Sequence, residues 1–366
     1  MLKFLRYIIC CMCFLAVVFT AAAAHNEETA SDTKKFNVKE FIFSHAGDSY
    51  GWHVTTWGDT HITIPLPIIA YSKDKGWNFF LSSKLHHGEY KGFYLAEEGE
   101  YKGKLVERNA AGKEVRPIDL SLTKNAAALI INSVILICIV LGMVRWYKKR
   151  PSRSVPKGFV GAMEMFVMNI HDDLIKPCAG HKYQRYAPYL LTVFFFIFIN
   201  NMMGLIPFFP GGASTTGNIA VTMTLALCTF FVVNLFGNKE YWKEILWPDV
   251  PTWMKAPIPL MPVLELFGIF TKPFALMIRL FANIMAGHAI ILGLSCLIFL
   301  TVVKGPAVNA GMTFISVIMS ILMNFLELLV AYIQAYVFTM LSAVFIGLSQ
   351  PEAHHHKAKT PKLATK

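Results

Sequence analysis

The chain has 366 residues, of which 55% are hydrophobic and only 16% are charged, a composition too apolar for a soluble globular protein. Its formal net charge is +11 at pH 7, but the basic residues flank apolar runs instead of alternating with aromatic residues on one face. This pattern argues against a nucleic-acid-binding protein and follows the positive-inside rule, so the sequence predicts an all-α polytopic membrane protein.

Residues 1–24 have the pattern of a signal peptide. Lys3 and Arg6 precede an apolar core from Tyr7 to Thr20, and the small residues Ala21–Ala24 follow it. The core is shorter than the ~20 residues that a spanning helix needs, which favours cleavage near the alanines over the alternative of a retained first span.

Residues 25–124 are polar and mixed in composition. Their β-branched and aromatic residues cluster in HITIPLPIIAYS (61–72), WNFFLSS (77–83) and GFYLAEE (92–98), with glycines between and after these segments. We expect a small β-rich extracytoplasmic region. The region contains no cysteine, so no disulfide framework holds it together.

The first apolar run of spanning length covers residues 125–146. The densest positive cluster of the chain accompanies its end, which places that end in the cytoplasm. This cluster comprises Arg145, Lys148, Lys149, Arg150, Arg153 and Lys157. Residues 156–176 combine apolar and polar positions at helical spacing, which predicts an amphipathic helix on the cytoplasmic surface.

Four more apolar stretches follow, at 186–207, 217–237, 259–303 and 309–348. The last two are joined by a short turn at 304–306, and each would extend about 60 Å or more at ~1.5 Å per residue, against a hydrocarbon core of ~30 Å. We therefore expect about five transmembrane helices, including a long, strongly tilted C-terminal helical hairpin. The basic tail is cytoplasmic by the count of spans. The expected organisation is a signal peptide (1–24), an extracytoplasmic region (25–124), a membrane channel domain (125–350) and a cytoplasmic tail (351–366).

Arg279 lies in the middle of an apolar run, KPFALMIRLFANIMAGH (272–288). A charge near the centre of a spanning helix costs roughly 2.5–3.5 kcal/mol on insertion scales, so it indicates a functional site. The alternative is an arginine that snorkels to the headgroups or pairs with a neighbouring helix for structural reasons.

Other polar residues of the hairpin align with Arg279. On the first long helix, the spacings of 7, 7 and 4 residues keep them within about 60° of one another. These are Glu265, Lys272, Arg279 and Asn283. A second predicted stripe on the returning helix comprises Ser316, Ser320, Asn324, Glu327 and Gln334.

Folding the hairpin about residues 304–306 brings Arg279 level with Gln334, and His288 level with Glu327. Ionisable groups in such a series are what a proton or ion path needs. Because Glu265 and the His288/Glu327 pair lie on opposite sides of Arg279, the pattern predicts two half-paths separated by a fixed positive charge.

These residues resemble subunit a of the F-type ATP synthase. The family places its essential arginine before L-F-x-N-x-x-A-G, and Glu265, Gln334 and NMMGLIPF (201–208) also fall at family positions. In this chain the arginine motif consists of Arg279, Leu280, Phe281, Asn283, Ala286 and Gly287. The resemblance covers about residues 125–350. In many bacterial members the residue types of His288 and Glu327 are exchanged, whereas mitochondrial relatives have the order found here.

The resemblance implies a proton-translocating stator subunit. Arg279 would face the carboxylates of a rotating c-subunit ring, Glu265 would line the cytoplasmic half-channel, and His288 and Glu327 would belong to the outer one. Five further polar residues are implied, two on the proton path (Asn283 and Gln334) and three in support (Asn201, Ser320 and Asn324). The implied partners are the c ring, the b-subunit peripheral stalk, the remaining ATP synthase subunits and the lipid of a bacterial inner membrane.

A proton- or sodium-coupled secondary transporter is the alternative function, although such proteins usually have a repeated half and the sequence has no internal repeat. GEYKGK (99–104) is one residue short of P-loop spacing, so we expect no bound nucleotide and no enzyme activity of the chain on its own. No cofactor, metal or nucleic acid is expected. Protons are the expected ion because a His288/Glu327 pair can titrate, whereas sodium favours oxygen ligands alone.

Overall fold

The computed structural model describes residues 47–350 except for short gaps, at 58–59, 73–74, 86–87, 97–100, 102, 109–113, 152–153, 207–208, 247–259 and 303–304. The predicted signal peptide and the predicted C-terminal tail lie outside the described residues. The chain forms two compact units. Unit 1 comprises the residues up to Val134, Asn200–Gly217 and Asn283–Val330. Unit 2 comprises Ile135–Ile199, Asn218–Ala282 and the residues from Ala331 onward.

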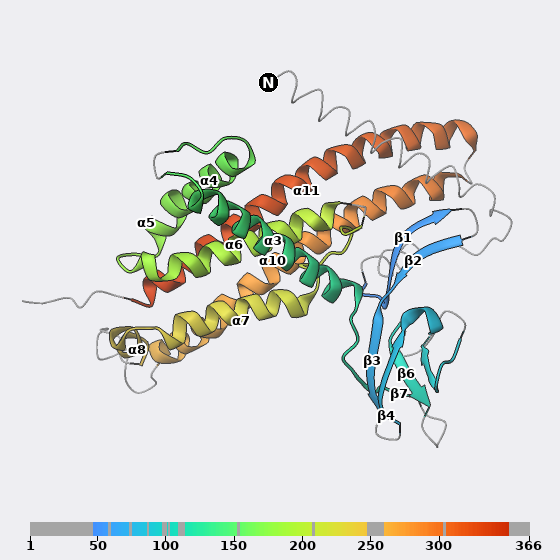
Figure 1. The fold of residues 1–366 in the computed structure, drawn as a ribbon, viewed down its shortest axis with the longest axis horizontal. Helices are drawn as coiled ribbons and strands as arrows, with labels where there is room; N and C mark the ends of the chain where they lie inside the picture. The colour runs from blue at the N-terminus through green and yellow to red at the C-terminus, as the bar shows by residue number, and fades with distance from the viewer. Residues whose placement is uncertain are drawn as a thin grey trace, which may run out of the picture. The chain divides into compact units, whose positions relative to one another are not determined.

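The N-terminal part of unit 1 is built from antiparallel strands (Figure 1). β1 (Gly51–Trp57) pairs with β2 (Thr60–Pro65), and β3 (Pro67–Ser72) pairs with both β4 (Gly76–Leu81) and β8 (Ile118–Asp119). A third sheet has β6 (Leu105–Arg108) between β5 (Phe93–Leu95) and β7 (Glu114–Val115). A 3-10 turn, η2 (Ser82–Leu85), follows β4.

The core of this β region lies between the second and third sheets. Alternate residues of a strand point to opposite faces, and Ile68 of β3 and Phe80 of β4 are buried together with Phe93 of β5 and Leu105 of β6. Tyr50 completes the core. Its hydroxyl donates to the Asp119 carboxylate and accepts the backbone N–H of Leu105 at 3.3 Å, so one side chain connects the two sheets.

The β region is fixed to the first turns of α3 (Lys124–Lys148) within unit 1. The backbone N–H of Lys124 donates to the Ser49 carbonyl at 2.9 Å, which satisfies one of the free N–H groups of the helix start. The apolar contact is made by Trp52 and Leu66 against small residues, which allow close approach. These are Ala127, Ala128 and Ala213.

Four helices are long and apolar enough to cross a membrane among the described residues. They are α3, α6 (Tyr183–Leu205), α10 (Leu260–Thr301) and α11 (Pro306–Leu348). The sequence predicted about five spans. The remaining apolar helix, α7 (Ile219–Leu235), has 17 residues and is therefore only about 25 Å long, shorter than a hydrocarbon core of ~30 Å. The chain is thus a multi-pass helical membrane protein.

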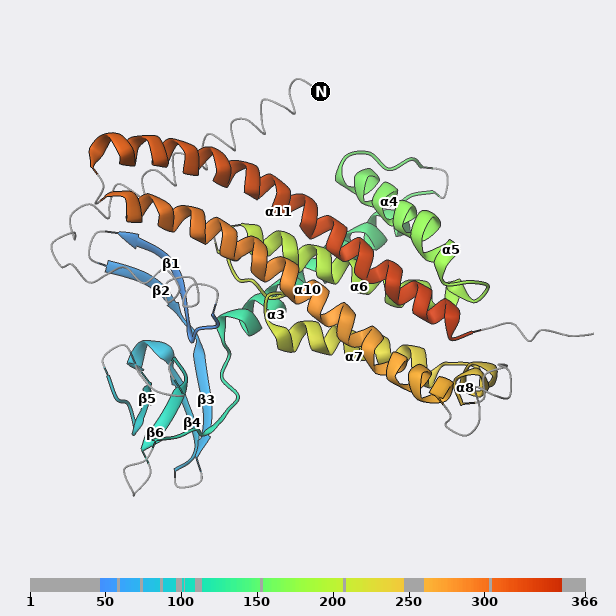
Figure 2. The same ribbon diagram turned by 180° about the vertical axis from the view of Figure 1, so that it is seen from behind.

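The expected C-terminal hairpin consists of α10 and α11, which have 42 and 43 residues (Figure 2). Each is about twice as long as the hydrocarbon core is thick. The predicted amphipathic helix at 156–176 consists of α4 (Phe159–Asn169), a π-helical turn η3 (Ile170–Ile175) and the short α5 (Lys176–Cys178).

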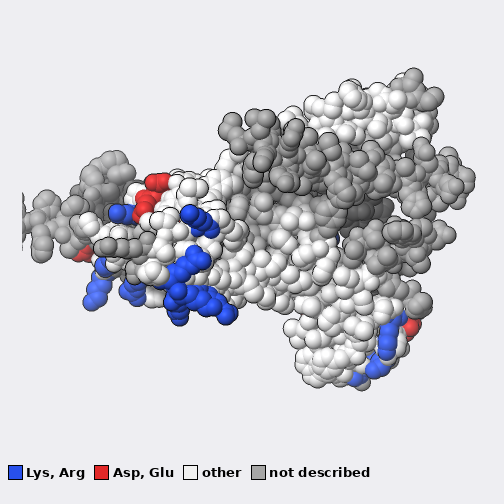
Figure 3. Space-filling model, turned by 45° about the horizontal axis from the view of Figure 1, so that its top comes forward, with Lys and Arg blue, Asp and Glu red and all other residues white. Residues whose placement is uncertain are grey.

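Unit 2 has a continuous apolar core to which α4, η3, α6, α7, α8 (Lys239–Leu246), α10 and α11 contribute. The end of α11 comes so close to α5 that a Cβ at Gly347 would overlap the backbone carbonyl oxygen of Cys178. Exposed basic residues gather where α3 ends, and Figure 3 shows Lys and Arg at that end of the helices beside a long uncharged surface. They include Arg145, Lys148, Lys149, Arg150 and Lys157.

Candidate functional site

Arg279 lies on the exposed face of α10 in unit 2. Leu276 and Leu280 are 2% and 0% exposed and pack into the core on the other face of the helix. Most exposed residues near Arg279 along α10 are apolar, including Phe274 and Ile278, and the polar Asn283 is exposed four residues further on. The guanidinium therefore stands as a fixed positive charge on an apolar helix surface, where a carboxylate of another chain could approach it.

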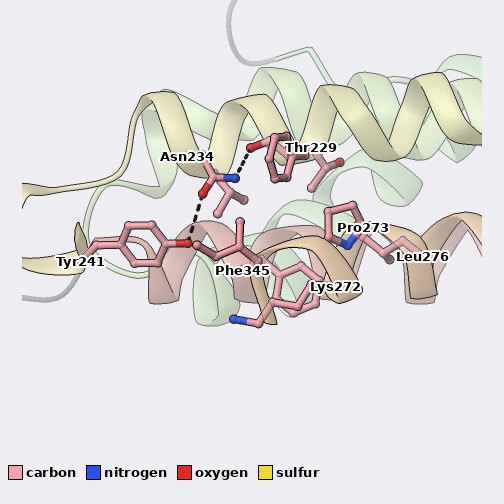
Figure 4. Close-up of a pocket in the computed structure, with 10 residues that line it drawn as sticks. Thr229, Asn234, Tyr241, Lys272, Pro273, Leu276 and Phe345 are labelled. Carbon is pink, nitrogen blue, oxygen red and sulfur yellow. Dashed lines mark hydrogen bonds between the residues drawn. The ribbon is translucent and has the colours of Figure 1, made fainter. Parts of the chain in front are cut away.

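Glu265 is also exposed on α10, two turns before Lys272. Its carboxylate lies near Tyr241 of α8. Burial raises the pKa of the Tyr241 phenol, and the negative charge of Glu265 raises it further. The Tyr241 hydroxyl donates to the side-chain oxygen of Asn234 at 3.4 Å (Figure 4).

A small cavity of about 20 Å³ lies beside this hydrogen bond, roughly the size that holds one water molecule (Figure 4). Its lining combines polar groups from α7 and α8 with apolar and basic ones from α10 and α11. They include Thr229, Asn234, Tyr241, Lys272, Leu276 and Phe345. The Lys272 ammonium lies over the Phe345 ring, 5.7 Å from its centroid, within the ~6 Å limit for a cation–π contact.

Gln334 of α11 is buried, with 2% of its surface exposed, whereas Arg279 is exposed. Both residues belong to unit 2. The predicted meeting of Arg279 with Gln334 stays a prediction.

The imidazole of His288 on α10 and the carboxylate of Glu327 on α11 lie side by side in unit 1. The distance from His288 Nδ1 to Glu327 Oε1 is 3.0 Å, although the angles are not those of a hydrogen bond. The Glu327 side chain is 4% exposed and the His288 side chain 22%. The prediction that these two residues approach each other is confirmed.

Gly287 makes room for this pair, and Gly204 lies close to it. A Cβ at Gly287 would lie 3.0 Å from Glu327 Oε1, so the missing side chain lets the carboxylate of α11 pack against the α10 backbone. A Cβ at Gly204 of α6 would lie 3.9 Å from His288 Nε2. The imidazole therefore lies between a buried carboxylate on one side and the end of α6 on the other.

Buried amides and hydroxyls hold the end of α6 to the loop that follows it. Asn201 is 3% exposed, and its side-chain oxygen accepts the Thr216 hydroxyl at 2.6 Å. The side-chain oxygen of Asn200 accepts both the Thr215 hydroxyl at 2.8 Å and the Asn132 amide of α3 at 3.0 Å. Sequence reasoning found Asn201 but missed Asn132, Asn200 and Thr215. The paired amides at 200–201 and paired hydroxyls at 215–216 were the signal that could have indicated them.

The predicted second stripe on α11 is not uniform. Ser316, Glu327 and Gln334 are buried, Ser320 is partly buried, and Asn324 is exposed with its amide donating to the Ser320 carbonyl at 2.9 Å. At ~100° per residue, Ser316, Glu327 and Gln334 fall within about 20° of one another, whereas Asn324 lies about 80° from Ser316. Asn324 therefore lies at the edge of the predicted stripe, and its supporting role stays a prediction. Asn283 of α10 is exposed, as Arg279 is.

A family model described as ATP synthase A chain matches residues 128–347, which is more than half of the chain. The chain belongs to the ATP synthase A chain family. The resemblance to subunit a of the F-type ATP synthase is thereby confirmed, and a secondary transporter is not favoured.

Similar members of the ATP synthase A chain family come from several bacteria. ATP synthase subunit a 2 of Chlorobaculum tepidum is 41% identical over 248 residues, covering 66% of this chain and 67% of the relative. ATP synthase subunit a of Chloroherpeton thalassium is 39% identical over 249 residues, covering 66% and 70%. ATP synthase subunit a of Myxococcus xanthus is 42% identical over 247 residues, covering 65% and 76%. Residues 41–126, which precede the part matched by the ATP synthase A chain model, match a second model, described as Domain of unknown function (DUF8433).

Proposed function

We propose that this stator subunit a of the ATP synthase carries protons through two offset half-channels separated by Arg279. Glu265, with Tyr241 beside it, lines the half-channel on the side of α8. The His288–Glu327 pair lines the other, with Asn201 in support. Each proton reaches a carboxylate on a rotating c ring through one half-channel and leaves it through the other.

The observation that carries this proposal is the contrast between Arg279 and the His288–Glu327 pair. Arg279 is exposed on an apolar surface, whereas Glu327 is almost completely buried against His288. A guanidinium stays protonated at any relevant pH, so it can attract a passing carboxylate and displace its proton, but it cannot relay that proton. The buried pair can pass a proton, and its His288 lies on the same helix as Arg279, about 13 Å further along at ~1.5 Å per residue.

The same proposal sets the orientation and partners of the chain. The basic cluster at the end of α3 supports a cytoplasmic position for that end, which puts the β region outside the cytoplasm of a bacterial inner membrane. The exposed apolar surface around Arg279 suits a c-subunit ring, and the b-subunit stalk and the remaining ATP synthase subunits complete the assembly.

The chain on its own would be a non-catalytic ion-channel subunit. Asn283 and Gln334 stay on the proposed path, and Ser320 and Asn324 remain supporting residues.

The test is ATP-driven acidification of inverted membrane vesicles that carry Arg279→Ala. Pumping should vanish, and passive proton leak should rise, because the fixed charge between the half-channels is gone. The matched control is Arg145→Ala, which removes another exposed positive charge, at the end of α3. Co-purification of the ring shows whether the complex has assembled. Undiminished pumping by an assembled Arg279→Ala complex would make the arginine structural and refute the proposal.

A further inference from the structure

One face of the β4-β3-β8 sheet is apolar and exposed. Along β4, Asn78 and Phe80 are buried, whereas Trp77, Phe79 and Leu81 are 56%, 66% and 47% exposed. The solvent face of an antiparallel sheet is normally polar, because only one face packs on the core. In this sheet the alternation instead places apolar residues on both faces.

The apolar face continues across the sheet to β8 and the segment after it. Tyr71 of β3 lies opposite both Trp77 and Ile118, so the three side chains form one row across the strands. The Tyr71 and Trp77 rings are 5.1 Å apart, and Ile118 and Leu120 are 61% and 60% exposed. Exposed apolar residues in contact with one another form a patch, and such patches mark interaction sites.

The opposite side of the β region is charged. Lys84 and Lys91 lie over the Tyr90 ring, and Arg108 lies over Tyr94, each with its charge at the surface. On the face of the β region that is seen in Figure 3, Lys and Arg side chains lie along one edge beside an uncharged surface. The β region is therefore amphipathic as a whole.

The apolar face is held close to the start of α3. The backbone N–H groups of Leu120 and Leu122 donate to the carbonyls of Ile69 and Pro67 at 2.9 and 3.1 Å, which continues the pairing with β3. From Leu120 to Lys124, where α3 begins, the chain can extend at most ~14 Å. The patch thus adjoins a helix that spans the membrane.

The face also points toward the side on which α3 begins. Along the horizontal direction of Figures 1 and 2, β5 and β6 lie on one side of the β3–β4 pair and α3 begins on the other. The buried side chains of β3 and β4 face β5 and β6. The exposed side chains of the same strands point the opposite way, because successive residues alternate between faces.

We propose that this face rests in the interfacial region of the lipid bilayer. Trp77 and Tyr71 are residue types that favour the headgroup level, and Phe79 would reach the acyl boundary. Lipid fits better than a protein partner because the patch is continuous along the chain with the apolar surface of α3, where Ile130 and Val134 are each 53% exposed. The charged side of the β region would then face water.

The experiment places the photoreactive residue p-benzoylphenylalanine at position 79 of the complete complex, reconstituted in phospholipid vesicles. Phe79 is 66% exposed, so an aromatic replacement should fold. The matched control carries the same residue at Lys91, which is exposed on the charged side. Illumination should attach phospholipid to this chain at position 79 and not at position 91, as read from the mass of the peptide.

Other adducts would overturn the proposal. Attachment of position 79 to another ATP synthase subunit, to a second copy, or to residues of this chain that precede residue 47 would mean that protein covers the face. Absence of any adduct, or equal lipid attachment at position 91, would mean that the face is free. ATP-driven pumping is measured in the same vesicles, so that a failure of the bilayer contact is distinguished from a failure of the proposed proton path.

Discussion

The Glu327 carboxylate is almost completely buried. This burial determines the chemistry of the part of the candidate path that lies in unit 1. Removing an isolated carboxylate from water costs several kcal/mol unless a partner compensates. A protonated His288, whose Nδ1 lies 3.0 Å from Glu327 Oε1, would be such a partner through its charge, and Gly287 provides the space in which the two side chains meet. The two side chains should therefore act as one unit.

Replacing Glu327 alone with alanine should slow proton-driven ATP synthesis strongly, because His288 loses its proton partner.

The exchange of His288→Glu with Glu327→His should retain more activity than either single change, since the contact is preserved in reverse order. The wild type, His288→Glu, Glu327→His and the double variant form a double-mutant cycle, which is measured through the synthesis rates of the assembled complexes. Additive losses would show that the two residues act independently, and a normal rate for Glu327→Ala would remove it from the path.

Gly287→Ala should also reduce proton-driven synthesis, but only in part. The added Cβ would lie 3.0 Å from Glu327 Oε1, so the carboxylate must shift by a few tenths of an ångström away from its place beside His288. Gly293→Ala is the matched control on the same helix, because a Cβ there meets nothing within 4 Å. Both changes raise helix propensity by about 1 kcal/mol, so any difference in synthesis rate reports the contact. Equal rates for the two variants would contradict it.

At the scale of elements, Tyr50 joins the sheets of the β region through a buried phenol. Burial and the hydrogen bond to Asp119 raise the pKa of Tyr50 well above its usual value. The pKa of Tyr50 is higher in the folded state than in the unfolded state, so its contribution to the free energy of unfolding is fully present below the unfolded pKa of ~10. This contribution is lost as the pH rises further. The β region should therefore loosen in alkali.

Tyr50→Phe should destabilise the β region by about 1–3 kcal/mol at neutral pH, because Asp119 and the N–H of Leu105 lose their shared partner. It should also weaken the loss of stability above about pH 10. Hydrogen exchange of β3 and β6 in the assembled complex, measured at pH 8 and pH 10.5, checks both effects. The control is Tyr94→Phe, a partly exposed hydroxyl that donates to Glu114. Identical exchange in both variants would count against the role of Tyr50.

At the scale of the whole molecule, the two halves of the proposed path belong to different units. The His288–Glu327 pair and Asn201 lie in unit 1 with the β region, whereas Arg279, Glu265 and Tyr241 lie in unit 2. The β region contributes Trp52 and Leu66 to the packing around the start of α3 but no residue to the proposed path. We therefore interpret it as accessory to proton conduction.

Deletion of residues 25–120, with residues 1–24 retained, should leave proton conduction in place. Assembly should weaken, because the apolar surface of Ala127, Ala128 and Ala213 loses the side chains that cover it. Passive proton flux through vesicles containing the membrane sector measures conduction, and ring co-purification measures assembly. An assembled complex that conducts no protons would show that the β region is essential.

The hairpin register could be predicted from the sequence because a short turn fixes which levels of the two helices face each other. This placed His288 beside Glu327 correctly. Exposure depends more finely on rotation about the helix axis, because Asn324, about 80° from Ser316 around α11, is exposed, whereas Ser316 is buried. The network of Asn132, Asn200 and Thr215 could not be predicted, because its hydrogen bonds join positions as far as 68 residues apart.

The amino-acid sequence alone was enough to identify a multi-pass helical membrane protein with a charged residue in an apolar hairpin. Span length and flanking charge act locally, so they can be read without knowing the packing. Three features became apparent only from the fold: which polar groups are buried together, that Gly287 makes room for Glu327, and that the sheet presents a second apolar face. These features depend on how distant segments approach and rotate against each other, which no local pattern specifies.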